Sequence, residues 1–424
     1  MKQPKKTVLP NGLRVLLVPQ PENMAATVLI LVQAGSEYET KRLSGVSHFL
    51  EHLMFKGTAN RPKPGMIDRE LASLGAQYNA FTDQEYTGYY VKAQAEKLPK
   101  TLEIISDLYL NPLIDPAEME KERGVIIQEI NMYEDDLPAR VHRNFLSLMY
   151  GDQPAGWDVA GTKASVQKIS RADVWKYREQ RYVMPGTIVV VAGRFDERKV
   201  LAQVKSLFGG LKRRTAAKKP RTTDRQSAPR LSVQFKESDQ AHLVLGFRAF
   251  DTFDPRRYAL RLAADVLGSG MSSRLFMKVR EELGAAYYVG AGADLSFDHG
   301  YLSISAGVGH GKLETVIAAI LGECRRMRDE TVPAEELQKS KDHMIGGIIL
   351  GLETSDDLAS FYGGQEVITR SALPPGVLVD RIKKTTAAEV RSVCRTVFRD
   401  AGMNLALVGP YRRQSAFRKL LKID

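Results

Sequence analysis

The chain has 424 residues, of which 43% are hydrophobic and 26% are charged, and its net charge is +11. This composition is typical of a globular protein with roughly two to four domains. No apolar run approaches the roughly 18 residues that a membrane span needs, and the basic start of the chain lacks the apolar segment of a secretory signal. We therefore expect no membrane span, and a cytoplasmic protein or a periplasmic one whose signal peptide has been removed.

The chain contains two cysteines, Cys324 and Cys394, which lie 70 residues apart. Disulfide-stabilised proteins usually have more cysteines than this. We expect both residues to be buried thiols, and a bond between them is the alternative.

Much of the positive charge is concentrated in residues 211–230, where eight Lys or Arg residues stand against Asp224 alone. This segment carries +7, which leaves +4 for the rest of the chain. A nucleic-acid site would depend on this stretch, but no aromatic side chains interleave with the charges to stack on bases. We interpret the segment as a solvated linker and expect no nucleic-acid partner.

The first half of the chain alternates between strand-like and helix-like patterns. Asp115 is a plausible N-cap before Pro116, so a long helix should begin there, run past Glu129 and kink near Pro138. The remaining patterns predict strands at residues 13–18, 25–33, 86–93 and 187–192, and helices at residues 45–57, 66–74 and 98–110.

The second half repeats this order with individual residues in common. LGAQYNA at Leu74 matches LGAAYYV at Leu283, and PAEMEKERGVIIQE at Pro116 matches PAEELQKSKDHMIG at Pro333. GVSHFLEH at Gly45 corresponds more faintly to GMSSRLFM at Gly270. A duplication explains these matches. We predict an α+β fold with two homologous halves, each a mixed, mostly antiparallel sheet packed with helices, at residues 1–210 and 231–424 with the linker between them.

Aligning the two halves singles out polar residues that the second half lacks. His48 aligns with Ser273, Glu51 with Phe276, His52 with Met277 and Glu129 with Gly346. Since the second half manages without these groups, the shared fold does not need them. These four residues of the first half are therefore candidates for a function rather than for a role in the fold.

The central motif is His48-Phe49-Leu50-Glu51-His52. On a helix, positions 48 and 52 stand about 40° apart, so both imidazoles can bind one zinc ion. Glu51 lies on the same side, where its carboxylate can reach a water molecule at the metal. Two histidines satisfied within a helix are the alternative interpretation of this motif alone.

A third ligand should come from elsewhere, because catalytic zinc usually has three protein ligands. Glu129 is our choice, on the long helix. Glu122 lies seven residues earlier and is offset by only about 20°, so both carboxylates face one way among strongly apolar neighbours. Glu122 would then orient a histidine ligand from behind.

With these residues in place, the chain resembles the pitrilysin and insulinase peptidases, a family that includes mitochondrial processing peptidase. HFLEHLMFKGT contains the inverted His-x-x-Glu-His motif of these zinc peptidases, and the resemblance runs from LPNGLRVLLV at Leu9 to LALVGP at Leu405. Glu129, 77 residues after His52, falls on the family's third ligand, and Glu122 on its supporting glutamate. The length resembles the smaller branch, in which two chains pair into a clamshell. The resemblance implies one Zn²⁺ per chain.

The resemblance also implies residues that bind substrate. The family's Asn-Ala-x-Thr edge strand, which binds substrate backbone, falls on Asn79, Ala80 and Thr82, and its Arg and Tyr that reach the active site fall on Arg280 and Tyr287. Without the resemblance, residues 76–82 would be an internal strand before a turn. Arg280 would then be a surface arginine and Tyr287 a core tyrosine, since Tyr78 has the same place in the first half.

These features together predict a zinc metalloendopeptidase. Glu51 would take a proton from the attacking water and pass it to the leaving nitrogen, while Tyr287 and Arg280 stabilise the oxyanion. The substrate would be a peptide or an unfolded polypeptide, bound as an added strand. The partner would be a second copy of the chain or an inactive homologue.

Two alternatives come from other classes of protein. One is a non-catalytic subunit of a processing or respiratory complex with the same fold, which the intact motif disfavours. The other is a metal-dependent hydrolase of other esters, but we find no two-metal carboxylate cluster in the sequence.

Overall fold

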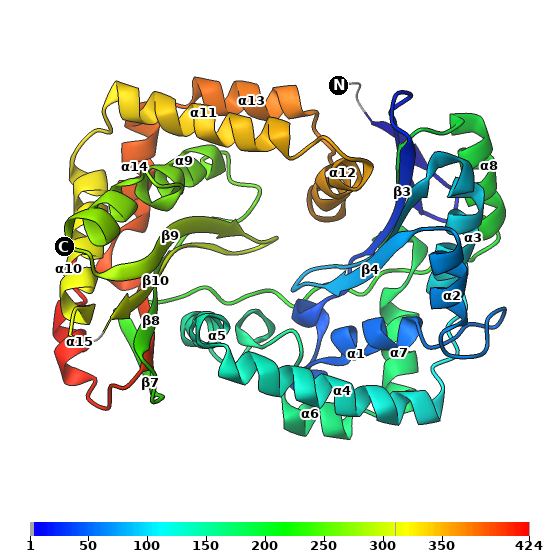
Figure 1. Cartoon of the computed structure of the whole chain (residues 1–424), viewed down its shortest axis with the longest axis horizontal. Coiled ribbons are helices and arrows are strands. Elements are labelled where there is room, and N and C mark those ends of the chain that lie inside the picture. Colours follow the sequence, from blue (N-terminus) through cyan, green and yellow to red (C-terminus); the bar gives the residue numbers. More distant parts are fainter. Residues whose placement is uncertain (1–3, 310, 424) are drawn as a thin grey trace. The chain divides into compact units, whose positions relative to one another are not determined.

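The computed structural model describes residues 4–309 and 311–423 (Figure 1). The chain forms two compact units. The first comprises Met1–Ile130, Trp157–Pro220 and Ile348–Pro375, and the second comprises Asn131–Gly156, Arg221–Gly347 and Gly376–Asp424.

The first unit is built on a six-stranded sheet with the order β1-β2-β6-β3-β5-β4. Its strands are β1 (Lys5–Val8), β2 (Arg14–Pro19), β3 (Ala25–Val32), β4 (Gln77–Thr82), β5 (Thr87–Gln94) and β6 (Thr187–Gly193). Strands β2 and β6 are parallel, and the other pairs are antiparallel. Its helices are α1 (Val46–Met54), α2 (Met66–Ser73), α3 (Leu98–Leu110), α4 (Pro116–Asp135), α6 (Lys163–Lys168), α7 (Arg171–Arg181), α8 (Glu197–Phe208) and α12 (Ser355–Thr369).

The second unit has a five-stranded sheet with the order β7-β11-β8-β10-β9. Its strands are β7 (Arg230–Phe235), β8 (Gln240–Arg248), β9 (Ala286–Leu295), β10 (Gly300–Gly309) and β11 (Met403–Gly409). Its helices are α5 (Leu137–Tyr150), α9 (Arg257–Gly268), a π-helical segment Phe276–Glu282, α10 (Leu313–Asp329), α11 (Ala334–Leu350), α13 (Pro375–Lys384), α14 (Ala387–Val397) and α15 (Ser415–Leu420).

The two sheets have the same topology. The parallel pair β7 and β11 corresponds to β2 and β6, and the antiparallel run β11-β8-β10-β9 corresponds to β6-β3-β5-β4. The predicted fold class, two homologous α+β halves with mostly antiparallel sheets, is therefore confirmed.

The chain passes from the first unit to the second between Pro220 and Arg221, inside the predicted linker, but each unit also contains a segment from the other half of the chain. Helix α12, which follows the second half's sheet strands β7 to β10 in the chain, packs on β3 and β6 of the first sheet (Figure 1). Helix α5, which belongs to the first half of the chain, packs on β8 and β11 of the second sheet. Each half thus gives one helix to the other half's sheet.

Alternating side chains explain how both faces of the first sheet become buried. Val28 and Ile30 on β3 point into a core with α1, α3 and α7, whereas Leu29 and Leu31 point to α12. On α12, a side chain at Gly363 would come within 2.7 Å of Leu31 Cδ1, so the glycine allows this close approach.

The long predicted helix ends earlier than its pattern suggested. Asp115 does cap it, because its carboxylate accepts the backbone N–H groups of Ala117 and Glu118 at 2.8 and 3.1 Å. Helix α4 then ends at Asp135, and Asp136 caps the new helix α5. Pro138 lies in the first turn of α5, where its missing N–H costs nothing, rather than at a kink.

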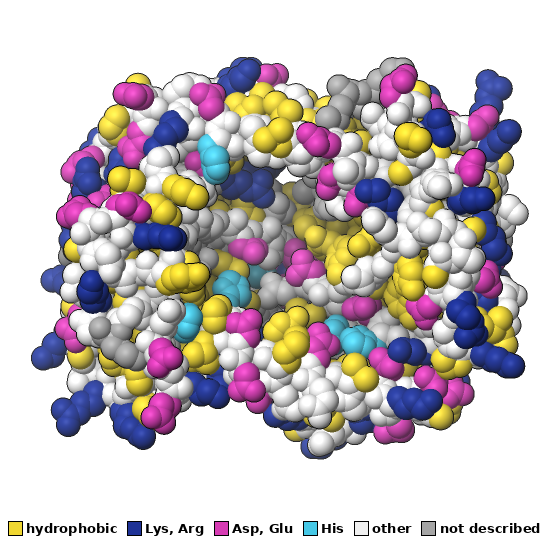
Figure 2. Space-filling model, in the orientation of Figure 1, with side chains coloured by type: hydrophobic (Ala, Val, Ile, Leu, Met, Phe, Trp, Pro, Cys, Tyr) yellow, Lys and Arg dark blue, Asp and Glu magenta, His cyan; other side chains and the backbone are white. Residues whose placement is uncertain are grey.

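The basic segment forms no helix or strand over residues 212–229, and most of it is exposed. Lys219 is an exception to the expected solvated linker, since its buried side chain pairs with Glu37 and Glu85 of the first unit. On the face shown in Figure 2, cationic and acidic side chains are interspersed rather than gathered in one patch.

Two smaller expectations can be compared with the structure. Cys324 and Cys394 are free and buried, as predicted. Within residues 4–309 and 311–423, no helix is long and apolar enough to cross a membrane.

Candidate metal centre

Helix α1 presents its polar residues on one side because its other side is part of the core. Phe49, Leu50, Leu53 and Met54 are all almost fully buried. Gly45 precedes the helix with a φ of 94°, and a Cβ there would lie 2.6 Å from the Ala160 carbonyl oxygen. The packing of this helix therefore fixes the positions of His48, Glu51 and His52.

Three side chains from α1 and α4 converge on one point. Nε2 of His52 lies 3.3 Å from Nε2 of His48, and each nitrogen lies 3.5 Å from Oε2 of Glu129. Four ligands at about 2.0–2.1 Å from a zinc ion in tetrahedral geometry are about 3.3–3.4 Å apart. The three donor atoms therefore have the spacing of one face of a zinc coordination tetrahedron.

Glu122 supports this cluster from behind. Its Oε2 lies 3.0 Å from Nδ1 of His52, and its Oε1 accepts from Nζ of Lys56 at 2.7 Å. A carboxylate on Nδ1 fixes the ring orientation and leaves Nε2 free to bind a metal. Lys56, one turn beyond His52, was not singled out by the sequence pattern.

Two of the three donor groups have the protonation state that suits a cation, whereas hydrogen bonds to Glu129 and Glu122 raise the pKa of the third, His52. Burial and the neighbouring His52 lower the pKa of His48 to about 4, so this ring is neutral at pH 7. A hydrogen bond from His52 lowers the pKa of Glu129, which keeps it ionised. A neutral imidazole and a carboxylate are the forms that bind zinc.

Glu51 lies beside the cluster and outside the set of donor atoms. Its Oε2 accepts a hydrogen bond from Oγ1 of Thr82 at 3.1 Å. Burial raises the pKa of Glu51, against the opposing charge of His52. A partly buried carboxylate with a raised pKa is suited to proton transfer near neutral pH.

Comparison with known proteins identifies the family of this chain. Residues 14–163 match the family model described as insulinase (peptidase family M16), and residues 168–344 match the model of the M16 inactive domain. A protein named as an uncharacterized zinc protease in Streptomyces coelicolor is 32% identical over 98% of this chain and 91% of its own length. The chain belongs to the M16 peptidase family.

Further comparisons show another relative in sequence and two solved structures with the same fold. An uncharacterized zinc protease of Bacillus subtilis, YmxG, is 30% identical over 96% of this chain and 98% of its own length. The fold is that of a protease from Helicobacter pylori, with a TM-score of 0.89, 24% identity and coverage of 96% and 99% of the two chains. A chain in complex III2 from Candida albicans also has this fold, with a TM-score of 0.87, 15% identity and 99% coverage of both chains.

The residues Asn79, Ala80 and Thr82 lie in strand β4, at one end of the first sheet. Among the described residues, strand β4 pairs only with β5, so its other side is an open sheet edge. The Asp83 N–H donates to the Tyr86 carbonyl at 2.9 Å, which makes these two residues a hydrogen-bonded pair. Because such pairs alternate, the backbone groups of Ala80 and Thr82 point to the open edge. The Ala80 N–H is accepted there by Oδ1 of Asn79 at 2.9 Å.

Arg280 and Tyr287 belong to the second unit and lie within residues 168–344, which match the model of the M16 inactive domain. Tyr287 on β9 is 75% exposed, so it is not the core tyrosine of the alternative interpretation. Nη1 of Arg280 donates to the Tyr287 carbonyl oxygen at 3.0 Å. The two residues are therefore neighbours.

One buried acid near the centre was missed in the sequence. Glu39 is 2% exposed, and its carboxyl oxygens accept the backbone N–H groups of Gly45 and Ser47 at 2.7 and 2.8 Å. It therefore caps the start of α1. No periodic pattern marks it, because it lies in an irregular segment before the helix.

Proposed function

We propose that this M16 protein is a zinc-dependent endopeptidase, with His48, His52 and Glu129 as the ligands of one zinc ion. The observation that carries the proposal is the spacing of 3.3 to 3.5 Å among the three donor atoms. Bound there, zinc would polarise a peptide carbonyl and make an attacking water more acidic. The name zinc protease of the 32% identical relative supports the choice of metal.

Glu51 is the proposed general base. It lies one residue before a ligand, is partly buried, and has a raised pKa. It would take a proton from the attacking water and later deliver it to the leaving nitrogen. The Thr82 hydroxyl, at 3.1 Å, would hold the carboxylate in position between substrate and metal.

The proposed substrate is an extended peptide or an unfolded polypeptide. It would pair with the open edge of β4 at Ala80 and Thr82 and displace the Asn79 side chain from the Ala80 N–H. Pairing through the main chain depends little on sequence. Compact proteins should therefore be poor substrates.

Arg280 and Tyr287 are the proposed oxyanion donors, because the exposed Tyr287 side chain is available for contact. We further propose that the working enzyme is a pair of chains enclosing a chamber, either two copies or this chain with an inactive homologue.

The Glu51→Gln variant tests the proposed function. The amide keeps the size of the side chain but cannot accept the proton, so turnover of an unfolded polypeptide should fall at least about 1,000-fold. Zinc content, measured by atomic absorption, should stay near one ion per chain. The matched control is Glu120→Gln, an exposed residue of α4 that should leave both quantities unchanged. Near-normal turnover in the Glu51 variant would contradict this role.

A non-catalytic subunit is the second candidate function. The fold shared with a chain of complex III2 favours it. The complete donor set and Glu51 disfavour it, since a structural subunit has no use for them. Zinc bound without any peptide hydrolysis by the wild-type protein, alone and with a homologous partner, would support this alternative.

A further inference from the structure

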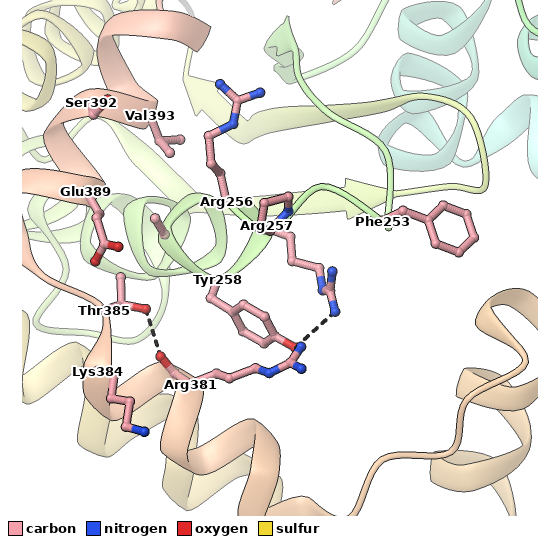
Figure 3. A pocket seen from close by; sticks show the side chains of 12 residues that line it. Phe253, Arg256, Arg257, Tyr258, Arg381, Lys384, Thr385, Glu389, Ser392 and Val393 are labelled. Atoms are coloured by element: carbon pink, nitrogen blue, oxygen red, sulfur yellow. Dashed lines mark hydrogen bonds between the residues drawn. The ribbon is translucent and has the colours of Figure 1, made fainter.

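The second unit contains a cavity of about 650 Å³ where the start of α9 meets the end of α13 and the start of α14 (Figure 3). Four cationic side chains line it, and only one acidic one, Glu389, does so. The cations are Arg256, Arg257, Arg381 and Lys384. None of these residues has a part in the proposed peptidase function.

Two of the guanidinium groups meet at one neutral oxygen. Nη2 of Arg257 and Nη1 of Arg381 both donate to the hydroxyl of Tyr258, at 3.1 and 3.0 Å (Figure 3). Tyr258 itself is buried, with 7% of its surface exposed. A phenol hydroxyl supplies no negative charge, so it orients the two cations without compensating their repulsion.

Two other charged side chains of the cavity, Arg256 and Glu389, have partners outside the pair of guanidinium groups. Arg256 is paired with Asp254 at 2.7 Å. Glu389 accepts from the backbone N–H and the hydroxyl of Thr386 at 2.7 and 2.9 Å, which caps α14. Within the described part of the chain, Arg257, Arg381 and Lys384 have no carboxylate partner. These three cations therefore form no salt bridge among the described residues, although the nearby Asp254 carboxylate interacts electrostatically with Arg257 as well as with Arg256.

We propose that this cavity binds a small phosphate-bearing ligand, with the phosphoryl oxygens held by Arg257, Arg381 and Lys384. Guanidinium groups present paired N–H donors that match phosphate oxygens, and a lysine adds a point charge. A phosphoryl group carries roughly −1.5 to −2 charge at pH 7, which balances three cations better than a single carboxylate does. The volume is within the range of roughly 300–1,000 Å³ of small-molecule sites.

The neighbouring helix supports the same ligand class. Helix α9 begins at Arg257, and its first residues line the cavity. The side chain of its N-cap residue Arg256 makes no capping hydrogen bond, while the Asp254 carboxylate accepts the Arg256 N–H at 2.8 Å. The partial positive charge of a helix start favours an anion. Free phosphate and the phosphate of a small ester share this chemistry, so the experiment compares both sources.

Calorimetric titration of the full-length chain tests the proposal, with inorganic phosphate and with glycerol 3-phosphate as probes and chloride keeping the ionic strength constant. Saturable binding of at least one probe is expected. The double variant Arg257→Gln/Arg381→Gln should weaken it about tenfold or more, because each change removes a charged donor. Arg399→Gln is the matched control, an exposed arginine of the same unit. Tighter binding of the ester would identify a phosphorylated small molecule as the ligand, and equal binding would identify free phosphate.

A second variant guards against loss of folding in the double variant. Lys384 is exposed and makes no hydrogen bond within the described residues, so Lys384→Gln should fold normally and weaken phosphate binding severalfold. Absence of saturable binding to the wild-type chain would overturn the proposal. So would equal phosphate affinity in the wild-type chain, the Lys384 variant and the Arg399 control, because binding would then be non-specific.

Discussion

At the scale of single residues, Glu39 shows how a buried acid can support a metal centre without touching it. Burial raises its pKa to about 8 from an ordinary value of 4.5, against the opposing hydrogen bonds from Ser47 and Gly45. Between these two values the folded protein keeps a proton that the unfolded chain loses. The contribution of Glu39 to the free energy of unfolding is therefore complete below about pH 4.5 and declines as the pH rises towards 8.

The Glu39→Gln variant should remove this pH dependence, because the amide does not ionise. The difference in Tm, wild type minus variant, should decrease steadily between about pH 5 and 8. Differential scanning calorimetry of both proteins, freed of metal by a chelator, would measure it. Other groups, such as His48, titrate in the same way in both proteins, so their contributions cancel in the difference in Tm. A difference that stays constant or grows with pH would show that Glu39 is ionised throughout this range.

The sequence predicted which residues of the centre lie together on one face of the same helix. His48, Glu51 and His52 lie within five residues, and Glu122 and Glu129 are two helical turns apart, so spacing alone put each set on one face. The choice of Glu129 as third ligand rested on its shared orientation with Glu122 among apolar neighbours, and the family resemblance then supported the meeting of the two helices. The structure places the three donor atoms within 4.8 Å of one another. Their role as zinc ligands stays a prediction until metal is measured.

At the scale of elements, β4 combines an open edge with a link to the proposed base. The backbone groups of Ala80 and Thr82 face the open edge, and they alternate with those of Asn79 and Phe81, which face β5. Proline is tolerated on an edge strand where the N–H points outward, since no hydrogen bond to the neighbouring strand is lost. Ala80→Pro therefore removes an edge donor while leaving the β4–β5 pairing intact.

We expect Ala80→Pro to lower kcat/KM for an extended peptide about tenfold or more, because a main-chain hydrogen bond to the substrate is lost. Zinc affinity should stay unchanged, and Tm should fall by only a few degrees. The control is Ala80→Gly, which keeps the N–H and should behave like the wild type. Steady-state kinetics on one peptide series would measure both variants. Unchanged kcat/KM in the proline variant would place substrate binding elsewhere.

Most elements around the site could be predicted because local signals determine them. Residues 98–110 correspond to α3 residue for residue, and Asp115 caps α4 as expected. The order of the strands could not be predicted in this way. Strand β6 lies between β2 and β3 although more than 150 residues separate it from both, and no local pattern records such a pairing. Which sheet a helix covers is equally non-local.

At the scale of the whole molecule, the exchange of α5 and α12 means that neither half of the sequence contains all the helices that cover its own sheet. Leu358, Ala359 and Tyr362 on α12 cover Leu29 and Leu31 of the first sheet, although they lie far beyond the linker in sequence. A buried ion pair joins the same helix to the sheet, since Glu366 pairs with Arg14 at 3.0 Å and with Lys6 at 2.6 Å. A sheet without this helix would expose an apolar face and an uncompensated Arg14.

A fragment of residues 1–210 should therefore fail to fold as an independent domain. Each large apolar side chain that loses its cover costs about 1.5–3 kcal/mol, so several of them approach the total stability of a domain, about 5–15 kcal/mol. Calorimetry of the fragment should show no cooperative transition, and it should bind a hydrophobic dye. Adding residues 348–375 as a separate peptide should restore part of the transition, because this segment contains α12. A stable, cooperatively unfolding fragment 1–210 would instead show that the first sheet needs no helix from beyond the linker.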